Sequence, residues 1–541
     1  MNPMNDGGAP APLLVTIRPT AEVTIKAPRT RDTFLRKLRL AVKDALQRAG
    51  FATRVRVQAN RVLAEVQPKA GEDAGLEEAR AALARVFGVG SFSFLEATAR
   101  PELDDIVAVG TELFAERVKG RRYAVRCKRN GRHAFSSMDV ERKLGAALNP
   151  GAQVDLTHPE VTVEVEVGER RAHFFSERHP GPGGLPLGTG GHALALLSGG
   201  YDSIVAAWQL MRRGVEVDFV HFRLGDLASE RTALEVAKRV SDAWAAGSRP
   251  EAHVIDLRGA MDEMREHVAP NLWQVSLKRL MVRAADGVAD AMEAYAAAEA
   301  LEGEDGARER GRRRARRRVD ALITGEAVGQ VSSQTLSNLR TIDAAAARPV
   351  LRPLIGFDKL DIIALAERIG TAELSAKAVE ECNITPVRPA TSSRAERLDR
   401  EEEGMTGGAL EAELARVASG ASRLPLRSLR AGEGWLDALA SGAEAPAGLG
   451  ELSVSELPED AVLLDCRSEA MRRWQPDWPR VVPAPLGPVD PAAFAKDATY
   501  VAFCPQGQRS AAVAERLREG GVRAYSFVGG EGALKRYLEG R

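Results

Sequence analysis

The segment HALALLSGGYDSIVAAWQLMRRG, residues 192–214, decides the fold of the largest domain of this chain. Five of its first six residues are apolar and predict a buried strand, and the run after SGGYDS has the spacing of a helix. Three further apolar segments, VDFVHF (217–222), AHVIDL (252–257) and DALIT (320–324), are separated by helical patterns. Because strands that alternate with helices form parallel sheets, this order predicts an α/β domain, which we assign to residues 179–395.

The SGGYDS turn has the chemistry of a phosphate site. Its two glycines allow a tight turn in which successive N–H groups point at an anion, and the N-terminus of the next helix adds partial positive charge. It is not a Walker loop, because no Gly-Lys-Ser/Thr follows. A plain strand-to-helix turn is the alternative. The pattern resembles the pyrophosphate loop of ATP pyrophosphatases and favours five ATP-binding residues: Ser198, Gly199, Gly200, Asp202 and Ser203.

A second polar run, TGEAVGQVSSQT (324–335), follows the strand DALIT. Loops at the carboxyl ends of parallel strands bind ligands in open α/β sheets, so this run is a candidate part of the same site. An ordinary helix-capping segment has a similar composition, and the residues alone leave both interpretations open. Lys278 and Arg279 lie on a predicted helix, where a basic pair is typical of surface charge.

The first part of the chain predicts a small α+β unit. LLVTIRPTAEVTI (13–25) predicts a strand and a turn, and helical spacing follows in residues 30–49. VRVQANRVLAEVQ (55–67) is strand-rich and precedes another helix near residues 75–86. This order is ferredoxin-like, and we expect the domain to occupy residues 1–73.

A basic segment lies within residues 74–178, which close with the alternating strand VTVEVEVG (161–168). Eight lysines and arginines lie between Arg117 and Arg132, with Tyr123 among them. This density of cations predicts a phosphate-contacting face for RNA, which shape and backbone contacts would recognise. The candidate RNA-binding residues are Lys128, Arg129, Arg132 and His133.

The C-terminal third predicts a linker with some helix, residues 396–451, and a compact α/β unit, residues 452–541. Cys504 opens the loop CPQGQRS, directly after the strand YVAF and before a helix. Loop N–H groups and a helix N-terminus would stabilise a thiolate or persulfide there; an unreactive core cysteine is the alternative. By pattern alone, the other cysteines are structural or partly buried: Cys127, Cys382 and Cys466.

Composition limits the class of protein. The chain has 541 residues, 44% of them hydrophobic, which is enough for several domains. The 75 basic and 75 acidic residues cancel, so net charge indicates no partner. Four cysteines without a CxxC pair or Cys/His cluster argue against a disulfide scaffold and a zinc site. No segment resembles a signal peptide or a membrane span, so we expect a cytoplasmic protein without membrane contact.

One arginine-rich segment interrupts the α/β pattern. GARERGRRRARRR (306–318) carries eight arginines between Arg308 and Arg318. Such a tract is typical of RNA contacts, but also of a solvated insertion or helix extension. The sequence leaves both interpretations open.

Three longer motifs complete the pattern: KRNGRHAFSSMDVERKLG (128–145), SLKRLM (276–281) and LRPLIGFDK (351–359). In order with SGGYDS, a lone cysteine and CPQGQRS, they resemble the bacterial tRNA 4-thiouridine synthase (tRNA sulfurtransferase) family, in its long form with a C-terminal rhodanese domain. The resemblance implies a multidomain α/β and α+β fold. Its parts are a ferredoxin-like N-terminal unit, a THUMP domain, a parallel-sheet ATP pyrophosphatase (PP-loop) domain and an α/β rhodanese domain.

The resemblance also implies a reaction. ATP adenylates the C4 oxygen of a tRNA uridine, expected at position eight, and persulfide sulfur replaces that oxygen to give 4-thiouridine. Cys504 is the implied persulfide carrier, Cys382 its redox partner, and Asp202 helps to place the phosphates or magnesium. The implied cofactor is ATP with Mg²⁺, with no firmly assigned metal ligand and no tightly bound organic group. Further ATP contacts are implied at Leu196, Leu197, Lys278, Gly325 and Gln334.

The implied partners are tRNA and a cysteine desulfurase as persulfide donor, with a sulfur-carrier protein of thiamine thiazole synthesis as a third. Two other classes of function stay open. One is sulfur transfer to thiamine synthesis by the C-terminal domain alone. The other is a non-catalytic RNA-binding scaffold, which the intact SGGYDS and CPQGQRS loops argue against. Pyrophosphate release that depends on tRNA would separate an enzyme from a scaffold.

Overall fold

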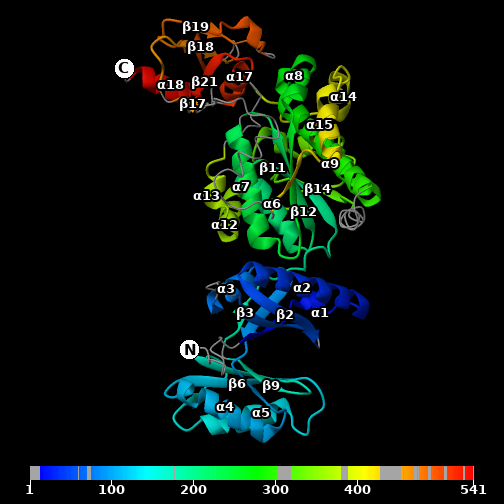
Figure 1. Ribbon diagram of the computed structural model, residues 1–541, viewed down its shortest axis with the longest axis vertical. Helices are drawn as coiled ribbons and strands as arrows, with labels where there is room; N and C mark the ends of the chain where they lie inside the picture. The colour runs from blue at the N-terminus through cyan, green and yellow to red at the C-terminus, as the bar shows by residue number, and fades with distance from the viewer. Residues whose placement is uncertain are drawn as a thin grey trace. The chain divides into compact units, whose positions relative to one another are not determined.

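The computed structural model describes residues 12–539, apart from residues 59, 70–74, 176, 226, 303–317, 379–387, 427–452, 455, 468–471, 473, 485–488, 505–507 and 528–529. Two compact units are formed. The first is Met1–Gly190 with Met211–Val215 and Ala243–Ser248, and the second is Gly191–Leu210, Glu216–Asp242 and Arg249–Arg541. The described strands form four sheets (Figure 1). None of the described helices has the length and apolar character needed to cross a membrane.

The first sheet has the predicted ferredoxin-like order. Its strands run β10-β4-β1-β3-β2, and each neighbouring pair is antiparallel. Because side chains alternate along a strand, Val15 and Ile17 of β1 both face the core, where Leu38 and Val42 of α2 meet them. The elements are β1 (Leu13–Pro19), α1 (Ala21–Thr24), α2 (Pro28–Arg48), β2 (Phe51–Gln58), β3 (Arg61–Pro68), α3 (Leu76–Leu83), β4 (Val89–Phe94) and β10 (His179–Pro180).

The core of this sheet extends beyond residue 73, where we expected the domain to end. Leu83 of α3 and Phe92 of β4 are fully buried in the same cluster as Leu38. β4 also pairs with β1 along the sheet. Both elements are needed to cover the apolar face, so the ferredoxin-like fold continues to Phe94.

The second sheet, in the same unit, has the order β5-β9-β8-β6-β7. Tyr123 and Cys127 of β6 face a core that includes Phe114 of α4 and Leu144 of α5, which leaves Lys128 on the exposed side. The elements are β5 (Ala97–Ala99), α4 (Leu103–Val118), β6 (Arg122–Arg129), α5 (Ser137–Leu148), β7 (Gln153–Val154), β8 (Val161–Val167) and β9 (Ala172–Phe175).

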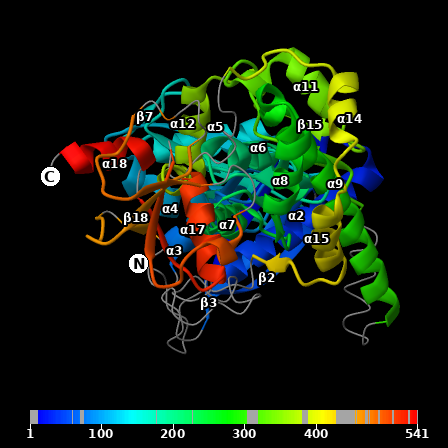
Figure 2. The same ribbon diagram turned by 90° about the horizontal axis from the view of Figure 1, so that it is seen from above.

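The third sheet confirms the predicted parallel α/β domain. Its order is β15-β14-β11-β12-β13-β16, and the first five strands are parallel. Helices α6 and α7 lie on one side of it and α9 and α15 on the other (Figures 1 and 2). The elements are β11 (His192–Leu197), α6 (Tyr201–Arg212), β12 (Glu216–Arg223), α7 (Leu227–Trp244), β13 (Glu251–Asp256), α8 (Arg258–His267), η1 (Pro270–Leu272), α9 (Trp273–Glu302), β14 (Ala321–Ile323), η2 (Ser332–Gln334), α11 (Leu336–Asp343), β15 (Val350–Leu351), α12 (Lys359–Ile369) and α13 (Ala372–Ser375).

Part of the expected linker 396–451 belongs to this sheet. β16 pairs antiparallel with β13, and Leu398 and Val417 are buried in the core that α9 also lines. A few apolar residues on one face of each helix suffice for this packing, and the overall composition of the segment hides them. The elements are α14 (Ala395–Glu402), α15 (Gly408–Ala418) and β16 (Arg423–Pro425).

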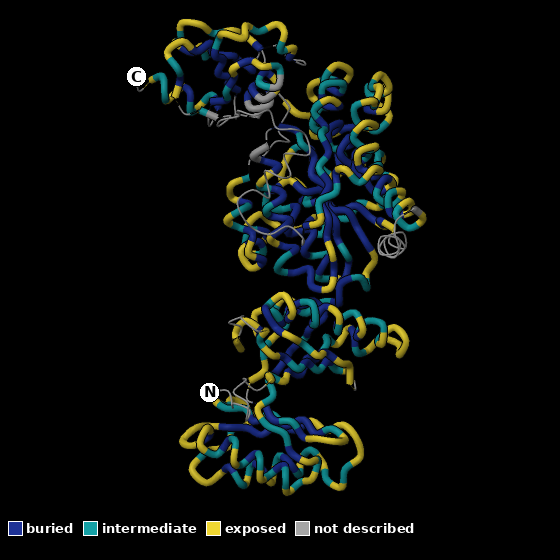
Figure 3. Tube along the Cα trace, in the orientation of Figure 1, coloured by how far each residue is buried: buried dark blue, intermediate teal, exposed yellow. Residues whose placement is uncertain are grey.

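The C-terminal sheet is parallel throughout, in the order β17-β21-β20-β18-β19. Its central strands β18 and β20 are buried along their whole length, as are β11 and β14 of the third sheet (Figure 3). The described residues between 453 and 539 therefore form a parallel sheet with helices α17 and α18. The elements are β17 (Ser453–Val454), β18 (Val462–Asp465), β19 (Val481–Pro483), η4 (Pro491–Ala493), β20 (Thr499–Phe503), α17 (Gln508–Glu519), β21 (Arg523–Phe527) and α18 (Gly530–Glu539).

Candidate active site

The predicted glycine turn joins β11 to α6 at the carboxyl edge of the third sheet. Gly199 has a φ of +78°, in the left-handed region that favours glycine. A Cβ at this position would lie 3.2 Å from the backbone nitrogen of Ala233. The N–H of Ser198 donates to Ser203 Oγ at 3.2 Å, which ties the turn to the first turn of α6. The turn is thereby fixed at a helix N-terminus, where an anion is favoured.

Gly325 packs directly on this turn. It follows β14, which pairs in parallel with β11, so the two loops leave the sheet at the same edge. A Cβ on Gly325 would lie 2.5 Å from the carbonyl carbon of Asp202 and 2.6 Å from the nitrogen of Ser203. No side chain fits in that space. The structure thus brings together two loops that the sequence predicted to share a site.

Asp202 is held by two residues that sequence reasoning did not single out. Lys359 Nζ donates to both of its carboxylate oxygens, at 2.7 and 2.9 Å, and Gln330 Nε2 donates to Oδ2 at 3.0 Å. Lys359 Nζ also lies 5.5 Å from the ring centroid of Tyr201. The motif LRPLIGFDK contained the signal, because its final lysine begins α12 directly after the N-cap Asp358.

His221 is a second residue that the structure adds. It is buried on β12, opposite Leu197 of β11, and its Nδ1 lies 3.0 Å from the Leu197 carbonyl oxygen. Burial lowers the pKa of His221, so the ring is neutral and Nδ1–H is the donor to that carbonyl. Nε2 is then an acceptor, and it has no hydrogen-bond partner within the described part of the chain. The acceptor lies on the strand next to the one that leads into the glycine turn.

The remaining predicted ATP residues fall into two groups. Leu196 and Leu197 are buried on β11, so only their backbone can face the loop. Gln334 is buried in η2, and its Oε1 lacks a hydrogen-bond partner among the described residues. Lys278 is half-buried on α9, one helical turn after Gln274, whose Oε1 accepts a hydrogen bond from Ser332 Oγ at 2.6 Å.

Arg279, expected on the surface, is instead a buried structural residue. Its Nε lies 3.2 Å from Glu402 Oε2, Nη1 donates to the Thr341 carbonyl at 3.0 Å, and Nη2 contacts Asp399. These bonds fasten α9 to α11 and α14. The burial of Arg279 was not predicted, because its acidic partners lie in the segment that was expected to be a linker.

The predicted RNA-binding residues gather at one end of β6 and in the loop before α5. Lys128, Arg129 and Arg132 are exposed, and His133 is half-buried with Nε2 3.2 Å from the Gly168 carbonyl oxygen. Burial, followed by repulsion from Arg178, lowers the pKa of Lys128. The loop ends at the capped N-terminus of α5, which adds partial positive charge beside the three cations Lys128, Arg129 and Arg132.

Cys504 follows the last residue of β20 and is buried. Ser510 Oγ donates to Cys504 Sγ at 3.6 Å. The backbone carbonyl oxygen of Cys504 accepts the N–H of Glu531 at 2.8 Å. Glu531 is in turn bonded by the buried Arg467, which also binds Asp465. The thiol therefore sits at the carboxyl end of a parallel strand, held by a fixed polar network.

The other cysteines differ in environment. Cys466 is buried in the same sheet, with Sγ 3.6 Å from the Leu464 carbonyl oxygen. Burial raises the pKa of Cys127 to about 11, as suits a structural thiol. Cys382 and the arginine-rich tract at 308–317 lie outside the described residues.

Among the residues that are described, no cluster of three or more His, Cys, Asp or Glu could hold a metal ion.

Three protein-family models match the chain. One described as "Thiamine biosynthesis protein (ThiI)" matches residues 188–304 and 312–406, "THUMP domain" matches 100–177, and "ThiI ferredoxin-like domain" matches 14–93. The first match is interrupted at residues 305–311, which include Arg308 and Arg310, and it resumes at Arg312 with the other six arginines of that segment.

Curated relatives and a solved structure agree with these models. The tRNA sulfurtransferases of Desulfurococcus amylolyticus and Pyrobaculum aerophilum are 34% and 36% identical, over 97% and 95% of this chain and 98% and 96% of their own lengths. That of Pseudomonas syringae pv. syringae is 35% identical over 75% of this chain and 78% of its own. The "Crystal structure of a 4-thiouridine synthetase - RNA complex with bound ATP" matches with a TM-score of 0.60 and 27% identity, covering 76% of this chain and 98% of that one. The resemblance is thus wider than bacterial, since the first two relatives are archaeal.

Proposed function

Because the chain belongs to the ThiI family of tRNA sulfurtransferases, we propose that it uses ATP to replace the C4 oxygen of a tRNA uridine with sulfur. One observation carries the ATP-dependent step: the close packing of Gly325 on the glycine turn, with Asp202 between Lys359 and Gln330. Together they form a phosphate cradle of backbone N–H groups, one carboxylate and one ammonium. The uridine is the one at position eight, and the product is 4-thiouridine.

The cradle suits adenylation. The C4 oxygen of uracil attacks the α-phosphate of ATP, and pyrophosphate leaves towards Ser198–Ser203, where N–H groups and the α6 N-terminus receive its negative charge. Lys359 is a point charge that can follow the departing phosphates. Asp202 is the carboxylate that would hold Mg²⁺, a hard cation that prefers oxygen ligands and would supply further charge neutralisation. Gln330 keeps that carboxylate oriented.

Sulfur delivery falls to Cys504 in this proposal, and we assign residues 452–541 to a rhodanese-type domain. The terminal sulfur of the Cys504 persulfide attacks C4, and AMP leaves. The Cys382 thiolate then attacks Cys504 Sγ, which breaks the S–S bond, leaves one sulfur on C4 and forms a Cys382–Cys504 disulfide. A cellular thiol reductant reopens the disulfide. The place of Cys504, between a parallel strand and the N-terminal end of α17, supports its role as an anionic carrier.

The tRNA is the macromolecular partner. The cations at 128–133 lie in the stretch that matches a THUMP domain, and they support binding to RNA phosphates. A cysteine desulfurase would load the persulfide in the cytoplasm. We also propose a second role, sulfur transfer to a carrier protein in thiamine thiazole synthesis; the description of the matched family, which names thiamine biosynthesis, supports a role in that synthesis.

Pyrophosphate release and nucleoside mass analysis test this function together. Wild-type chain with ATP, a persulfide donor and unmodified tRNA should release pyrophosphate and yield 4-thiouridine. Asp202→Asn should abolish both while the tRNA dissociation constant stays within about twofold of wild type, because the RNA-binding cations belong to the first unit. If the wild type bound tRNA but released no pyrophosphate, the result would indicate a non-catalytic RNA-binding scaffold instead.

A further inference from the structure

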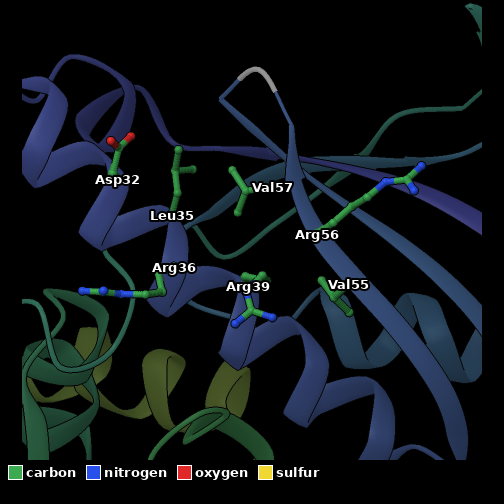
Figure 4. A pocket seen from close by; sticks show the side chains of 7 residues that line it. All are labelled: Asp32, Leu35, Arg36, Arg39, Val55, Arg56 and Val57. Carbon is green, nitrogen blue, oxygen red and sulfur yellow. The ribbon is translucent and has the colours of Figure 1, made fainter.

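Side chains that could assist sulfur transfer lie beside Cys504 and not in the pocket on the ferredoxin-like domain. That pocket, about 470 Å³ between α2 and β2, is lined by arginine, aspartate and aliphatic side chains (Figure 4): Asp32, Leu35, Arg36, Arg39, Val55, Arg56 and Val57. None of them is a thiol or a hydroxyl. In the C-terminal sheet, by contrast, two buried serines lie next to the Cys504 sulfur.

Cys504 ends a chain of two hydroxyl groups that come from different elements. Ser510 Oγ, in the first turn of α17, lies 3.6 Å from Cys504 Sγ. Ser526 Oγ, on β21, lies 2.9 Å from Ser510 Oγ. β21 pairs in parallel with β20, and Ser526 stands opposite Ala502, so it comes to the same end of the sheet as Cys504. Ser510 is fully buried and Ser526 is 3% exposed.

The directions of these hydrogen bonds follow from the number of protons. A serine hydroxyl has one proton to donate and two lone pairs that accept. Ser510 donates its proton to the sulfur, and it accepts the proton of Ser526. The second bond fixes the rotation of the Ser510 hydroxyl, because Ser526 occupies one of its lone pairs. Without Ser526, the Ser510 hydroxyl could rotate and donate elsewhere.

The charged groups near this end of the sheet bond one another. Arg467 Nε and Nη2 each donate to Asp465 at 2.8 Å, and Nη1 donates to Glu531 of α18 at 2.8 Å. The guanidinium is therefore held by two carboxylates from β18 and α18. The hydroxyl of Ser510, and not this guanidinium, is bonded to the sulfur.

We propose that Ser526 is a positioning residue for sulfur transfer, which holds the Ser510 hydroxyl with its proton on Cys504 Sγ and so favours the thiolate. Burial favours a neutral thiol, whereas a hydrogen bond donated to the charged form favours ionisation. The thiolate attacks the outer sulfur of the donor's cysteine persulfide, that S–S bond breaks, and its electron pair leaves on the donor cysteine. The proposal rests on the carrier role of Cys504 proposed above and adds two residues to it.

The ultraviolet absorbance of the Cys504 thiolate, followed against pH in the full-length chain, tests this arrangement. The signal is the difference between each variant and the same variant with Cys504→Ala. Ser510→Ala should raise the midpoint by about one pH unit, the effect of losing one hydrogen bond to a charged group. Ser526→Ala should raise it by about half a unit, because Ser510 remains but is no longer oriented.

Two comparisons separate positioning from general damage to the fold. The double variant should have the same midpoint as Ser510→Ala, because Ser526 acts through Ser510 and the two effects cannot add. The matched control is Thr499→Val, which removes a buried hydroxyl from the opposite end of β20. It should leave the midpoint at its wild-type value.

Loading of Cys504 from glutathione persulfide, read by mass analysis of the intact protein, gives the second measurement. Below the midpoint, loading should slow about tenfold in Ser510→Ala and about threefold in Ser526→Ala, in proportion to the lost thiolate. Above the midpoint the difference should disappear, because the thiol then ionises without the hydroxyl groups. Thr499→Val should load like wild type at every pH.

An unchanged midpoint in Ser526→Ala, an additive effect in the double variant, or a loading defect that persists at high pH would each overturn the proposal. None of these measurements needs ATP or tRNA. A Cys504→Ala chain that still formed 4-thiouridine would refute the carrier role in the proposed function. The absorbance comparison would even then decide whether the two serines control this thiolate.

Discussion

Lys359 Nζ bonds both carboxylate oxygens of Asp202, at 2.7 and 2.9 Å, although 157 positions separate the two residues. The contact forms because α12 begins where the glycine turn leaves the sheet. A phosphate that enters the turn would find this lysine bound to Asp202, in the first turn of α6. Lys359 therefore both holds Asp202 and can share its charge with ATP.

Lys359→Gln should lower the rate of tRNA-dependent pyrophosphate release about 100-fold. A loss of about 100-fold is typical when one preorganised donor that stabilises charge in the transition state is removed. The tRNA dissociation constant should not move. Lys377→Gln removes an exposed lysine beyond α13 and is the matched control, expected to act like wild type. A wild-type rate for Lys359→Gln would show that the Asp202 contact is only structural.

Gly325→Ala should impair ATP use by displacing the glycine turn. The added methyl group would lie 2.5 Å from the Asp202 carbonyl carbon, and such overpacking costs about 1–3 kcal/mol. We expect the apparent KM for ATP to rise about tenfold or more, read by pyrophosphate release against ATP concentration. Gly356→Ala, whose methyl group would meet nothing within 4 Å, should leave the KM unchanged. Equal behaviour of the two variants would contradict the packing argument.

Cys504→Ala should stop sulfur transfer yet leave tRNA-dependent pyrophosphate release intact, because adenylation needs no thiol. Cys382→Ala should block turnover while Cys504 still accepts sulfur from the donor, which mass analysis of the intact protein would show as one added sulfur. Cys127→Ala is the control and should retain both activities. Loss of pyrophosphate release in Cys504→Ala would show that adenylation depends on the thiol, and would refute the separation of adenylation from sulfur transfer.

After one turnover without reductant, the wild type should contain a Cys382–Cys504 disulfide, visible as a linked peptide pair. Free thiols at both positions after product has formed would refute the two-cysteine route. A Cys466–Cys504 pair would instead move the resolving role to the neighbouring strand. We expect the Cys382 pair, because Cys466 is buried in the core of the sheet.

The thiol of Cys127 should resist alkylation in the folded protein. With a pKa of about 11, only about 0.3% of it is thiolate at pH 8.5, against about half for an ordinary cysteine. Iodoacetamide labelling followed by peptide mapping should therefore be about 100-fold slower at Cys127 than in urea. Because the folded pKa is raised, the folded state loses stability as pH rises from about 9 to 11. Cys127→Ala should remove that part of the pH dependence, and rapid labelling of the native chain would contradict the burial.

The sequence by itself determined the α/β and ferredoxin-like orders and the glycine turn. Apolar periodicity and glycine placement are local properties, so the strand at 192–197, the turn after it and the next helix could be placed without tertiary information. For the same reason Cys504 was correctly expected at a strand end. The residues that meet Asp202 were not local to it, and they were missed.

Tertiary structure alone decided which distant residues share a site. Lys359 and Gln330 reach Asp202, and His221 reaches Leu197, because parallel strands bring their carboxyl ends to one edge. Tertiary packing also decided that residues 395–426 form α14, α15 and β16 and are not a linker. Spacing along a chain fixes what a segment can become, whereas the burial of a few side chains against partners more than a hundred residues away fixes where it packs.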